Sequence, residues 1–459
     1  MQKKRELFET APVPRALAAF AVPTIISQLI IMIYNLADTV FIGMANDPSK
    51  TAASSVAFVL VFAMNCLSNL FGVGGGSLIS RLLGEHKDED AAGVSAFSFF
   101  GSLAVSAVYS VIVYIFMEPF LYFLGATAGS IGYASDYAFY VVVIGAVPST
   151  LAMTFSILLR SEGFAKHASI GVGLGGVLNM ILDPVFMFLI LEPGNEVKGA
   201  AIATLLSNVF VLVYFIIVLI RLGDRSVLSL NPCRIRIPWK YASSVFAVGF
   251  PSALSSALAC LASIMINNLT SGYSYLYGDV PVAAVGIAKK IDMLPMNVGL
   301  GLCQGMMPLV AYNYSSGNYK RMRAFSTAAR NAGIIFALLC ILIFEIFAEN
   351  IVRMFIGDAD TVRMATDFLR IMCLAVPFMI ANFQLGFTLQ AMGLGKQSLL
   401  LSSLRQGIVN IPLMLLMNSL FGLYGLIWTQ IISDFITIII SYVVYNHTYK
   451  KLIKSQISE

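Results

Sequence analysis

Residues 20–43 read FAVPTIISQLIIMIYNLADTVFIG and contain a single charged side chain, Asp38. This run is longer than the roughly 20 apolar residues that an α-helix needs to cross the hydrocarbon core of a bilayer. It is also longer than the apolar core of a secretory signal and lacks a small-residue cleavage site, so we expect it to be retained. The stretch therefore predicts a membrane protein whose first span carries an acid.

The whole composition agrees with this interpretation. Hydrophobic residues make up 58% of the 459 residues, charged residues make up only 12%, and the mean hydropathy is +0.83. Average soluble domains are about 25% charged. The formal net charge of +5 is dispersed along the chain, so we expect the lipid bilayer as a partner and no nucleic acid.

Apolar runs between charged or Gly/Pro-rich breaks predict twelve spans. We expect helices near 15–42, 52–82, 93–117, 131–160, 168–191, 198–221, 242–271, 281–314, 325–347, 361–391, 397–420 and 422–447.

The basic residues predict the orientation of these spans. Most of the 29 Lys and Arg residues, Arg405 among them, fall in the N-terminus, the C-terminus and alternate loops. The other loops hold only Lys50, Lys198, Arg353, Arg363 and Arg370. Because Lys and Arg are enriched in cytoplasmic loops, we expect both termini in the cytoplasm and a multi-pass protein of the bacterial inner (cell) membrane.

The chain is an internal duplication. Phe20-Ala21-Val22-Pro23 is matched 228 residues later by Val248-Gly249-Phe250-Pro251. Gly72 and Gly76 are matched by Gly301 and Gly305, and Gly163-x-x-Lys166 is matched by Gly393-x-x-Lys396, at nearly the same offset. We expect an all-α polytopic membrane protein with two pseudo-symmetric six-helix lobes. The predicted division is an N-terminal lobe at 1–222, a cytoplasmic linker at 223–240 and a C-terminal lobe at 241–459.

Three motifs resemble one known family. Residues 23–43, PTIISQLIIMIYNLADTVFIG, resemble the first helix of the multidrug and toxic compound extrusion (MATE) family. Leu159-Arg160-Ser161-Glu162-Gly163 resembles its motif after the fourth helix, and residues 308–321, PLVAYNYSSGNYKR, are similar to the eighth-helix motif of the MepA-like branch. The resemblance implies a V-shaped pair of lobes and secondary active export of organic cations in exchange for protons or sodium ions.

Acids inside the spans are the candidates for ion coupling, because a charge in hydrocarbon is costly and is kept for function. Asn35 and Asp38 share a helix face in the first span, and Asn179 and Asp183 share a face in the fifth. Thr204 belongs to a polar stripe of the sixth span. The MATE resemblance implies ion-coupling roles for Asp38, Asn179, Asp183 and Thr204. A buried carboxyl pair can hold a proton, and with amide and hydroxyl oxygens it can hold sodium, so the sequence leaves the ion open.

The C-terminal lobe differs at these positions. Ile266 and Met414 stand where the N-terminal lobe has Asp38 and Asp183. The C-terminal lobe instead carries Lys290 and Asp292 in the eighth span and Asp434 in the twelfth. We expect a second polar site there, either a gate or a neutralised network, with Asp434 as the partner of Lys290.

Soft and aromatic side chains are the candidates for contacts with flat cations. The predicted substrate-binding residues are Tyr34, Met153, Phe155, Met180, Met293 and Met296, with Met32 and Tyr312 as further cavity candidates.

Other function classes lack their motifs. No catalytic triad, Walker motif or metal-ligand spacing is present, so we expect neither an enzyme nor a cofactor other than the coupling ion. We expect a monomer. The alternative function is a flippase for a lipid-linked oligosaccharide or peptidoglycan precursor, whose pyrophosphate calls for a basic cavity; Lys289, Lys290 and Arg160 keep it open.

Overall fold

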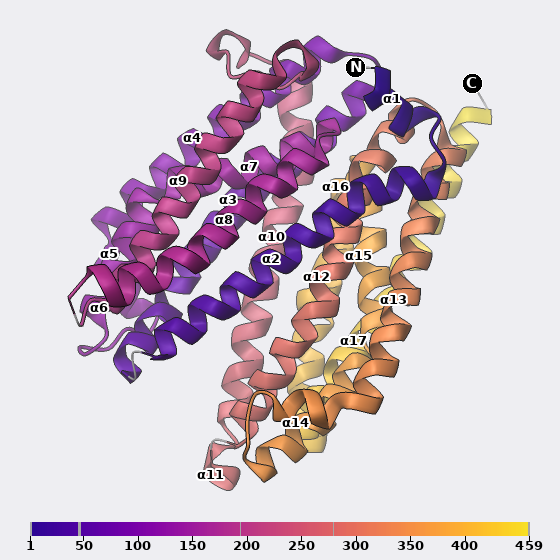
Figure 1. Ribbon diagram of the computed structural model, residues 1–459. Coiled ribbons are helices and arrows are strands. Elements are labelled where there is room, and N and C mark those ends of the chain that lie inside the picture. Colours follow the sequence, from indigo (N-terminus) through magenta and orange to yellow (C-terminus); the bar gives the residue numbers. More distant parts are fainter. Residues whose placement is uncertain (1, 45–46, 193, 279, 458–459) are drawn as a thin grey trace.

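The computed structural model describes residues 2–44, 47–192, 194–278 and 280–457, and every regular element in these ranges is a helix. Figure 1 shows long helices in two groups, the earlier ones (indigo to magenta) on one side and the last ones (orange to yellow) on the other. Apolar runs form helices here because a helix satisfies every backbone N–H and C=O within the segment, as hydrocarbon requires.

The first group, which we call the N half, comprises residues 2–222. Its helices are α1 (Gln2–Glu9), α2 (Val13–Met44), α3 (Pro48–Gly84), α4 (Asp88–Ile115), α5 (Met117–Phe123), α6 (Ile131–Ala138), the π-helix η1 (Phe139–Ile144), α7 (Ala146–Glu162), α8 (Ala165–Pro184), the π-helix η2 (Val185–Ile190) and α9 (Glu196–Leu222).

The connection and the second group, the C half, follow. The connection holds two short 3₁₀ turns, η3 (Gly223–Arg225) and η4 (Pro232–Arg234). The C half comprises α10 (Trp239–Ser271), α11 (Ser274–Tyr277), α12 (Val280–Ser315), α13 (Tyr319–Arg353), α14 (Ala359–Cys373), α15 (Val376–Ala391), α16 (Gly395–Ser403), the π-helix η5 (Leu404–Ile408) and α17 (Asn410–Ile457).

Each half contains a span broken by a proline. The fourth span bends by 53° between Ile131–Ile144 and Ala146–Glu162, and the tenth bends by 43° between Ala359–Cys373 and Val376–Ala391. Pro148 and Pro377 lie just after the bends, where neither residue has an N–H to donate to the preceding turn. The two prolines are 229 residues apart, so the bends repeat the duplication.

The last helical run contains two spans. Residues Gly395–Lys451 form a continuous 57-residue apolar candidate, which as one straight helix would extend roughly 86 Å, against a hydrocarbon core of about 30 Å. Gly422 interrupts it with φ 61° and ψ −144°, a conformation that glycine adopts readily. Tyr445, after this break, packs against an apolar cluster that contains Leu401, before it, so the chain reverses direction at Gly422.

These breaks account for twelve spans. Nine helical runs in the described ranges are long and apolar enough to cross a membrane, or eleven if each bent pair forms one span, and the reversal at Gly422 divides the last. Figure 1 places the N- and C-termini at the same end of the molecule, as an even number of spans requires. We call this the terminal end and its opposite the far end.

Glycines bring the two halves into close contact. A Cβ atom on Gly301 or Gly305 of α12 would lie 2.7 Å or 2.6 Å from the Cα atoms of Ile25 or Ala21 of α2. A Cβ atom on Gly249 of α10 would lie 1.8 Å from the Leu70 carbonyl oxygen of α3. Small residues allow such helix approach in membranes, where packing drives association. The second copy of the duplicated glycine motif thus lies at the α2–α12 contact, whereas Gly72 and Gly76 of the first copy face Ile157 and Ser161 of α7.

The N-terminal segment is bound to α12 and α13 of the C half at the terminal end. Arg321 of α13 donates through Nε to the carbonyl of Phe8 (2.7 Å) and through Nη2 to that of Ala11 (2.6 Å). Asn313 of α12 also donates to the Phe8 carbonyl, and the Tyr312 ring stacks on Phe8 at 4.6 Å. Tyr312, a cavity candidate from the sequence, is 2% exposed and belongs to this buried contact.

The connection between the halves rests on the N half. Glu162, at the end of α7, accepts hydrogen bonds from Ser226 Oγ (2.6 Å) and Val227 N (2.7 Å). The division into 1–222, 223–240 and 241–459 stays a prediction, although α10 already begins at Trp239.

Candidate functional site

The N half gathers its polar residues where α8 and α9 pack together. Asn179 and Asp183 are one helical turn apart on α8 and are both buried, Asp183 completely. Asn179 Nδ2 donates to Asp183 Oδ1 (3.1 Å) and to Thr204 Oγ1 of α9 (3.4 Å). The second oxygen of Asp183, Oδ2, has no hydrogen-bond partner among the described residues. That oxygen is free to take a proton or coordinate an ion.

Pro184 shapes the backbone beside this acid. Its ring nitrogen cannot donate to the carbonyl of Met180, and the α-helix gives way here to the wider π-helix η2. A broken helical turn is tolerated within a membrane span only where neighbouring groups satisfy the freed backbone groups. The sequence therefore places an irregular turn next to Asp183.

The acid of α2 faces the same cluster. Asp38 interacts electrostatically with Asp183, and both acids interact with Tyr34 and with Tyr137 of α6. Oδ1 of Asp38 is buried and has no hydrogen-bond partner in the described part of the chain. The structure thus brings Asp38 and Asp183 together, and no described Lys or Arg forms an ion pair with either acid.

A glycine sets the spacing of this cluster. A Cβ atom on Gly176 of α8 would lie 2.8 Å from Ile30 and 3.0 Å from Tyr34, so α2 can approach α8 closely only at a glycine. Tyr137, which is 8% exposed, was not predicted from the sequence. No motif marks it, since α6 is a short helix and the cluster forms only on packing. Asn35, the remaining predicted member, is exposed on α2.

The predicted substrate residues do not form one surface. Tyr34 and Met180 are half-buried near the acids, and Met153 of α7 is 40% exposed. Phe155, in contrast, is 2% exposed and packs between Phe99 and Phe215 in the core of the N half. Its packing gives it a structural role there.

The remaining candidates lie elsewhere in the fold. Met32 of α2 is 8% exposed. Met293 and Met296 of α12 are half-buried, and Met296 packs against an apolar cluster of the C half that includes Val376 and Ile380.

The polar cluster of the C half is built around an ion pair. Arg405 Nε donates to Asp434 Oδ1 (2.6 Å) and its Nη2 donates to Oδ2 (3.3 Å), while Gln430 Nε2 donates to Oδ2 (2.7 Å). The Arg405 guanidinium also lies 4.6 Å from the centroid of the Phe383 ring. Asp434 is completely buried and Arg405 nearly so.

Two predictions about this cluster were wrong. Arg405, counted from the sequence as a loop charge, lies in the π-helix η5 and is buried in the span, because Asp434 neutralises it there. The predicted pairing of Lys290 with Asp434 is not formed, since Lys290 is exposed on α12 and Arg405 takes the carboxylate.

Asp292 of α12 is the third member of the C-half cluster. It interacts electrostatically with Asp434 and Arg405, and its Oδ1 has no hydrogen-bond partner within the described ranges. Its neighbour Lys289 instead donates to Asn267 Oδ1 of α10 (3.0 Å). The structure therefore brings Asp292 and Asp434 together and leaves Lys290 outside.

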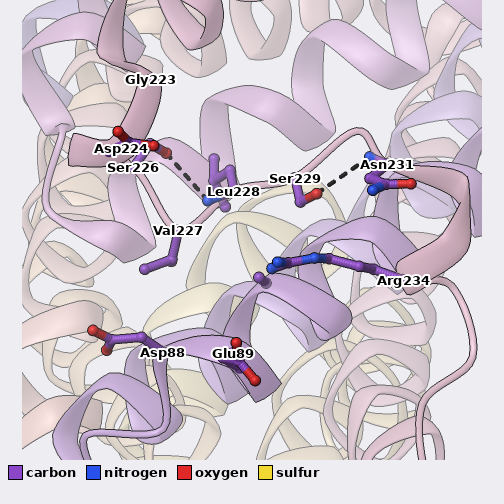
Figure 2. Close-up of a pocket in the computed structure, with 11 residues that line it drawn as sticks. Asp88, Glu89, Gly223, Asp224, Ser226, Val227, Leu228, Ser229, Asn231 and Arg234 are labelled. Carbon is purple, nitrogen blue, oxygen red and sulfur yellow. Dashed lines mark hydrogen bonds between the residues drawn. The ribbon is translucent and has the colours of Figure 1, made fainter.

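A cavity lies at the terminal end, away from both clusters. Its volume is about 390 Å³. Figure 2 shows Asp88 and Glu89, from the start of α4, on one side of it and the connection from Gly223 to Asn231 on the other. The cavity is a gap between the N half and the docked connection, and none of the predicted site residues lines it.

Comparisons with known proteins agree with this architecture. The MatE family model matches residues 23–185 and again residues 251–416, so the two matches repeat the duplication. The multidrug export protein MepA of Staphylococcus saprophyticus subsp. saprophyticus is 31% identical over 427 residues, which cover 93% of this chain and 92% of the relative.

Solved structures share the fold. One reported as the outward-facing conformation of a multidrug resistance MATE family transporter has a TM-score of 0.91 at 22% identity and covers 99% of each chain. A MOP superfamily transporter from Pyrococcus furiosus, whose binding pocket is reported to have reverse polarity, has a TM-score of 0.87 at 21% identity and covers 97% of this chain and 98% of the other. With a family model that matches both halves and a relative above 30% identity along nearly its whole length, this chain belongs to the MatE family of membrane transporters.

Proposed function

We propose that this protein exports organic cations by exchange for inward-moving protons or sodium ions that bind at Asp38 and Asp183. The observation that carries the proposal is a pair of acids, Asp183 buried and Asp38 half-buried, that lacks a basic partner in the described residues and has a buried, unbonded oxygen on each acid. A carboxylate pair left without a countercharge in a membrane needs a cation.

The coupling ion and the drug then compete for one negative charge. In the state open to the far end, ion binding neutralises the acids and releases the organic cation. In the state open to the terminal end, the ion leaves and the next organic cation is drawn in. Each elementary charge that moves inward supplies roughly 2.3 kcal/mol per 100 mV of membrane potential.

The soft residues beside the acids suit this role. Tyr34 and Met180 lie next to the acids, and aromatic faces and thioethers bind flat cations without strict shape requirements. The similarity to the multidrug export protein MepA supports drugs as the substrates. We place the protein in the bacterial inner membrane as a monomer with both termini in the cytoplasm.

Ethidium transport in everted vesicles tests the proposal. Wild-type protein should accumulate ethidium under an imposed proton or sodium gradient, and the gradient that works names the ion. Asp183→Asn should abolish gradient-driven transport at unchanged protein level, whereas Asp360→Asn, an exposed acid of α14, should not. Gradient-driven transport retained in Asp183→Asn would refute the assignment of this acid.

The lipid flippase is the second candidate, because one buried base, Arg160, lies between the halves. Absence of ethidium transport by the wild type in either gradient would favour it.

A further inference from the structure

Three helices meet in a polar contact between the halves. Arg160, in the last turn of α7, donates through Nη1 to Gln304 Oε1 of α12 (2.9 Å). Gln28 of α2 donates through Nε2 to the same oxygen (2.9 Å). The contact therefore joins two helices of the N half to one of the C half.

The charge of Arg160 has no counterpart among the residues that the structure describes. Arg160 is 6% exposed, its Nε has no hydrogen-bond partner, and no acid in the described ranges forms an ion pair with it. Glu162, two residues later, is occupied by Ser226 and Val227 of the connection. A buried charge without a partner carries a desolvation penalty of several kcal/mol. An anion from outside the protein would remove this penalty.

The surroundings leave a path to the base. Gln28 and Gln304 are only half-buried. Met153 lies seven residues before Arg160 on the same face of α7 and is 40% exposed. Asn35 lies seven residues after Gln28 on the same face of α2 and is exposed.

The two halves diverge beyond this contact. Leu294, which precedes Gly301 by seven residues on the same face of α12, is 40% exposed, whereas Gly301 is in contact with α2. Figure 1 shows α2 and α12 running apart toward the far end. Arg160 thus lies where the closed part of the interface meets its diverging part.

We propose that Arg160, with the side-chain amides of Gln28 and Gln304, binds the carboxylate of zwitterionic substrates. This inference rests on the proposed function, because the cationic group of the same molecule would lie toward Asp38 and Asp183. Gln28 and Asp38 are ten residues apart on α2, which corresponds to roughly 15 Å along the helix. A planar guanidinium donates two parallel hydrogen bonds to a carboxylate, and Arg160 would give up its bond to Gln304 Oε1 to do so.

A matched pair of dyes tests the subsite. Rhodamine B carries a carboxylate and is a zwitterion at neutral pH, and its ethyl ester is a cation of nearly the same shape. Uptake of each dye into everted vesicles is compared for wild type, Arg160→Gln, Arg160→Lys and Arg81→Gln. Arg81 is the matched control, because it is another arginine at the contact between the halves, beside Gly393.

The expected result is selective. Arg160→Gln should reduce rhodamine B transport relative to its ester by roughly ten- to a hundredfold, the size of a lost hydrogen bond to a charged group. Arg160→Lys should restore part of it, and Arg81→Gln should leave the ratio of the two dyes unchanged.

Other outcomes separate the two proposals. Equal loss of both dyes in Arg160→Gln would mean that Arg160 only holds the halves together, and would overturn the subsite. An unchanged ratio of the dyes would overturn it as well. Wild-type transport of the ester without rhodamine B would overturn the subsite and leave cation export intact. Transport of neither dye by the wild type would overturn the proposed function itself and with it the subsite.

Discussion

The two halves share a scaffold but treat buried charge in opposite ways. In the N half, Asp183 receives a hydrogen bond from Asn179, and its other oxygen has no hydrogen-bond partner in the described part of the chain. In the C half, Asp434 lies 230 residues after Thr204, close to the offset of the duplication, and both its oxygens are bonded by Arg405 or Gln430. One copy of the fold therefore presents an acid without a basic partner in the described ranges, and the other copy presents a neutralised pair.

The difference shows how a duplicated transporter can assign distinct roles to equivalent helices. A buried carboxylate with a tightly bound guanidinium has little need of an external cation, because the pair is neutral and hydrogen-bonded. A carboxylate with only amide and hydroxyl neighbours needs an external cation to balance its charge. Coupling is accordingly expected in the N half, and structural support in the C half.

The largest effect is expected from exchanging the acids for amides in each half. Asp183→Asn should reduce gradient-driven export to the level of vesicles without transporter, since an amide cannot take the ion. Asp292→Asn should retain gradient dependence, because Asp434 and Arg405 stay paired. Initial rates at a series of imposed gradients measure both variants. Equal loss in the two would mean that both halves couple.

The next effect concerns stability in the C half. Asp434→Ala should destabilise the protein by about 3–5 kcal/mol, because Arg405 is left buried without a countercharge. Thermal unfolding in detergent measures this. Arg405→Met combined with Asp434→Leu should recover most of the loss. If Asp434→Ala were as stable as the wild type, a structural role for the Arg405–Asp434 pair would be contradicted.

A smaller effect is expected at the edge of the N-half cluster. Thr204→Val removes the hydroxyl that Asn179 contacts at 3.4 Å, which should weaken the cluster by about 1 kcal/mol, or roughly fivefold in the ion concentration for half-maximal transport. Titration of the driving ion at fixed ethidium gives this number. A change above about a hundredfold would make Thr204 a direct ion ligand.

The smallest effect is expected at an exposed acid of the C half. Asp358 caps α14, and hydrogen bonds from the hydroxyl (2.7 Å) and the backbone N–H (2.9 Å) of Thr361 lower the pKa of its carboxyl. Because the pKa of Asp358 is lowered in the folded protein, the cap contributes its full stabilisation of the fold at pH values above the ordinary Asp pKa. This contribution is lost as the pH falls through the lowered pKa of Asp358. Asp358→Ala should therefore lower the unfolding temperature slightly at neutral pH.

The same pair of proteins provides the check in acid. Thermal unfolding in detergent should show the wild type and Asp358→Ala converging as the pH drops below the ordinary Asp range. A difference that persists or grows in acid would show that the carboxylate is not what stabilises the cap.

The sequence alone determined the helical architecture. Its apolar runs predicted the spans to within a few residues for most boundaries, because in a bilayer the length of an apolar run and the need for internal hydrogen bonds leave only helices. The constant offset of the repeats predicted the duplication, which the family model matches twice. Asp38 and Asp183 were predicted to belong to one cluster, because acids in apolar spans are rare and each of the two is conspicuous in the sequence.

Only the tertiary structure decided which polar groups meet. Tyr137 joins the acids, Arg405 takes Asp434 in place of Lys290, and Arg160 reaches Gln304 across the halves. Each of these contacts joins residues on different helices, and helical periodicity reports only the face that a residue occupies on its own helix. The partner depends on how helices cross and rotate, which small residues such as Gly176 and Gly301 set through close packing in the folded protein.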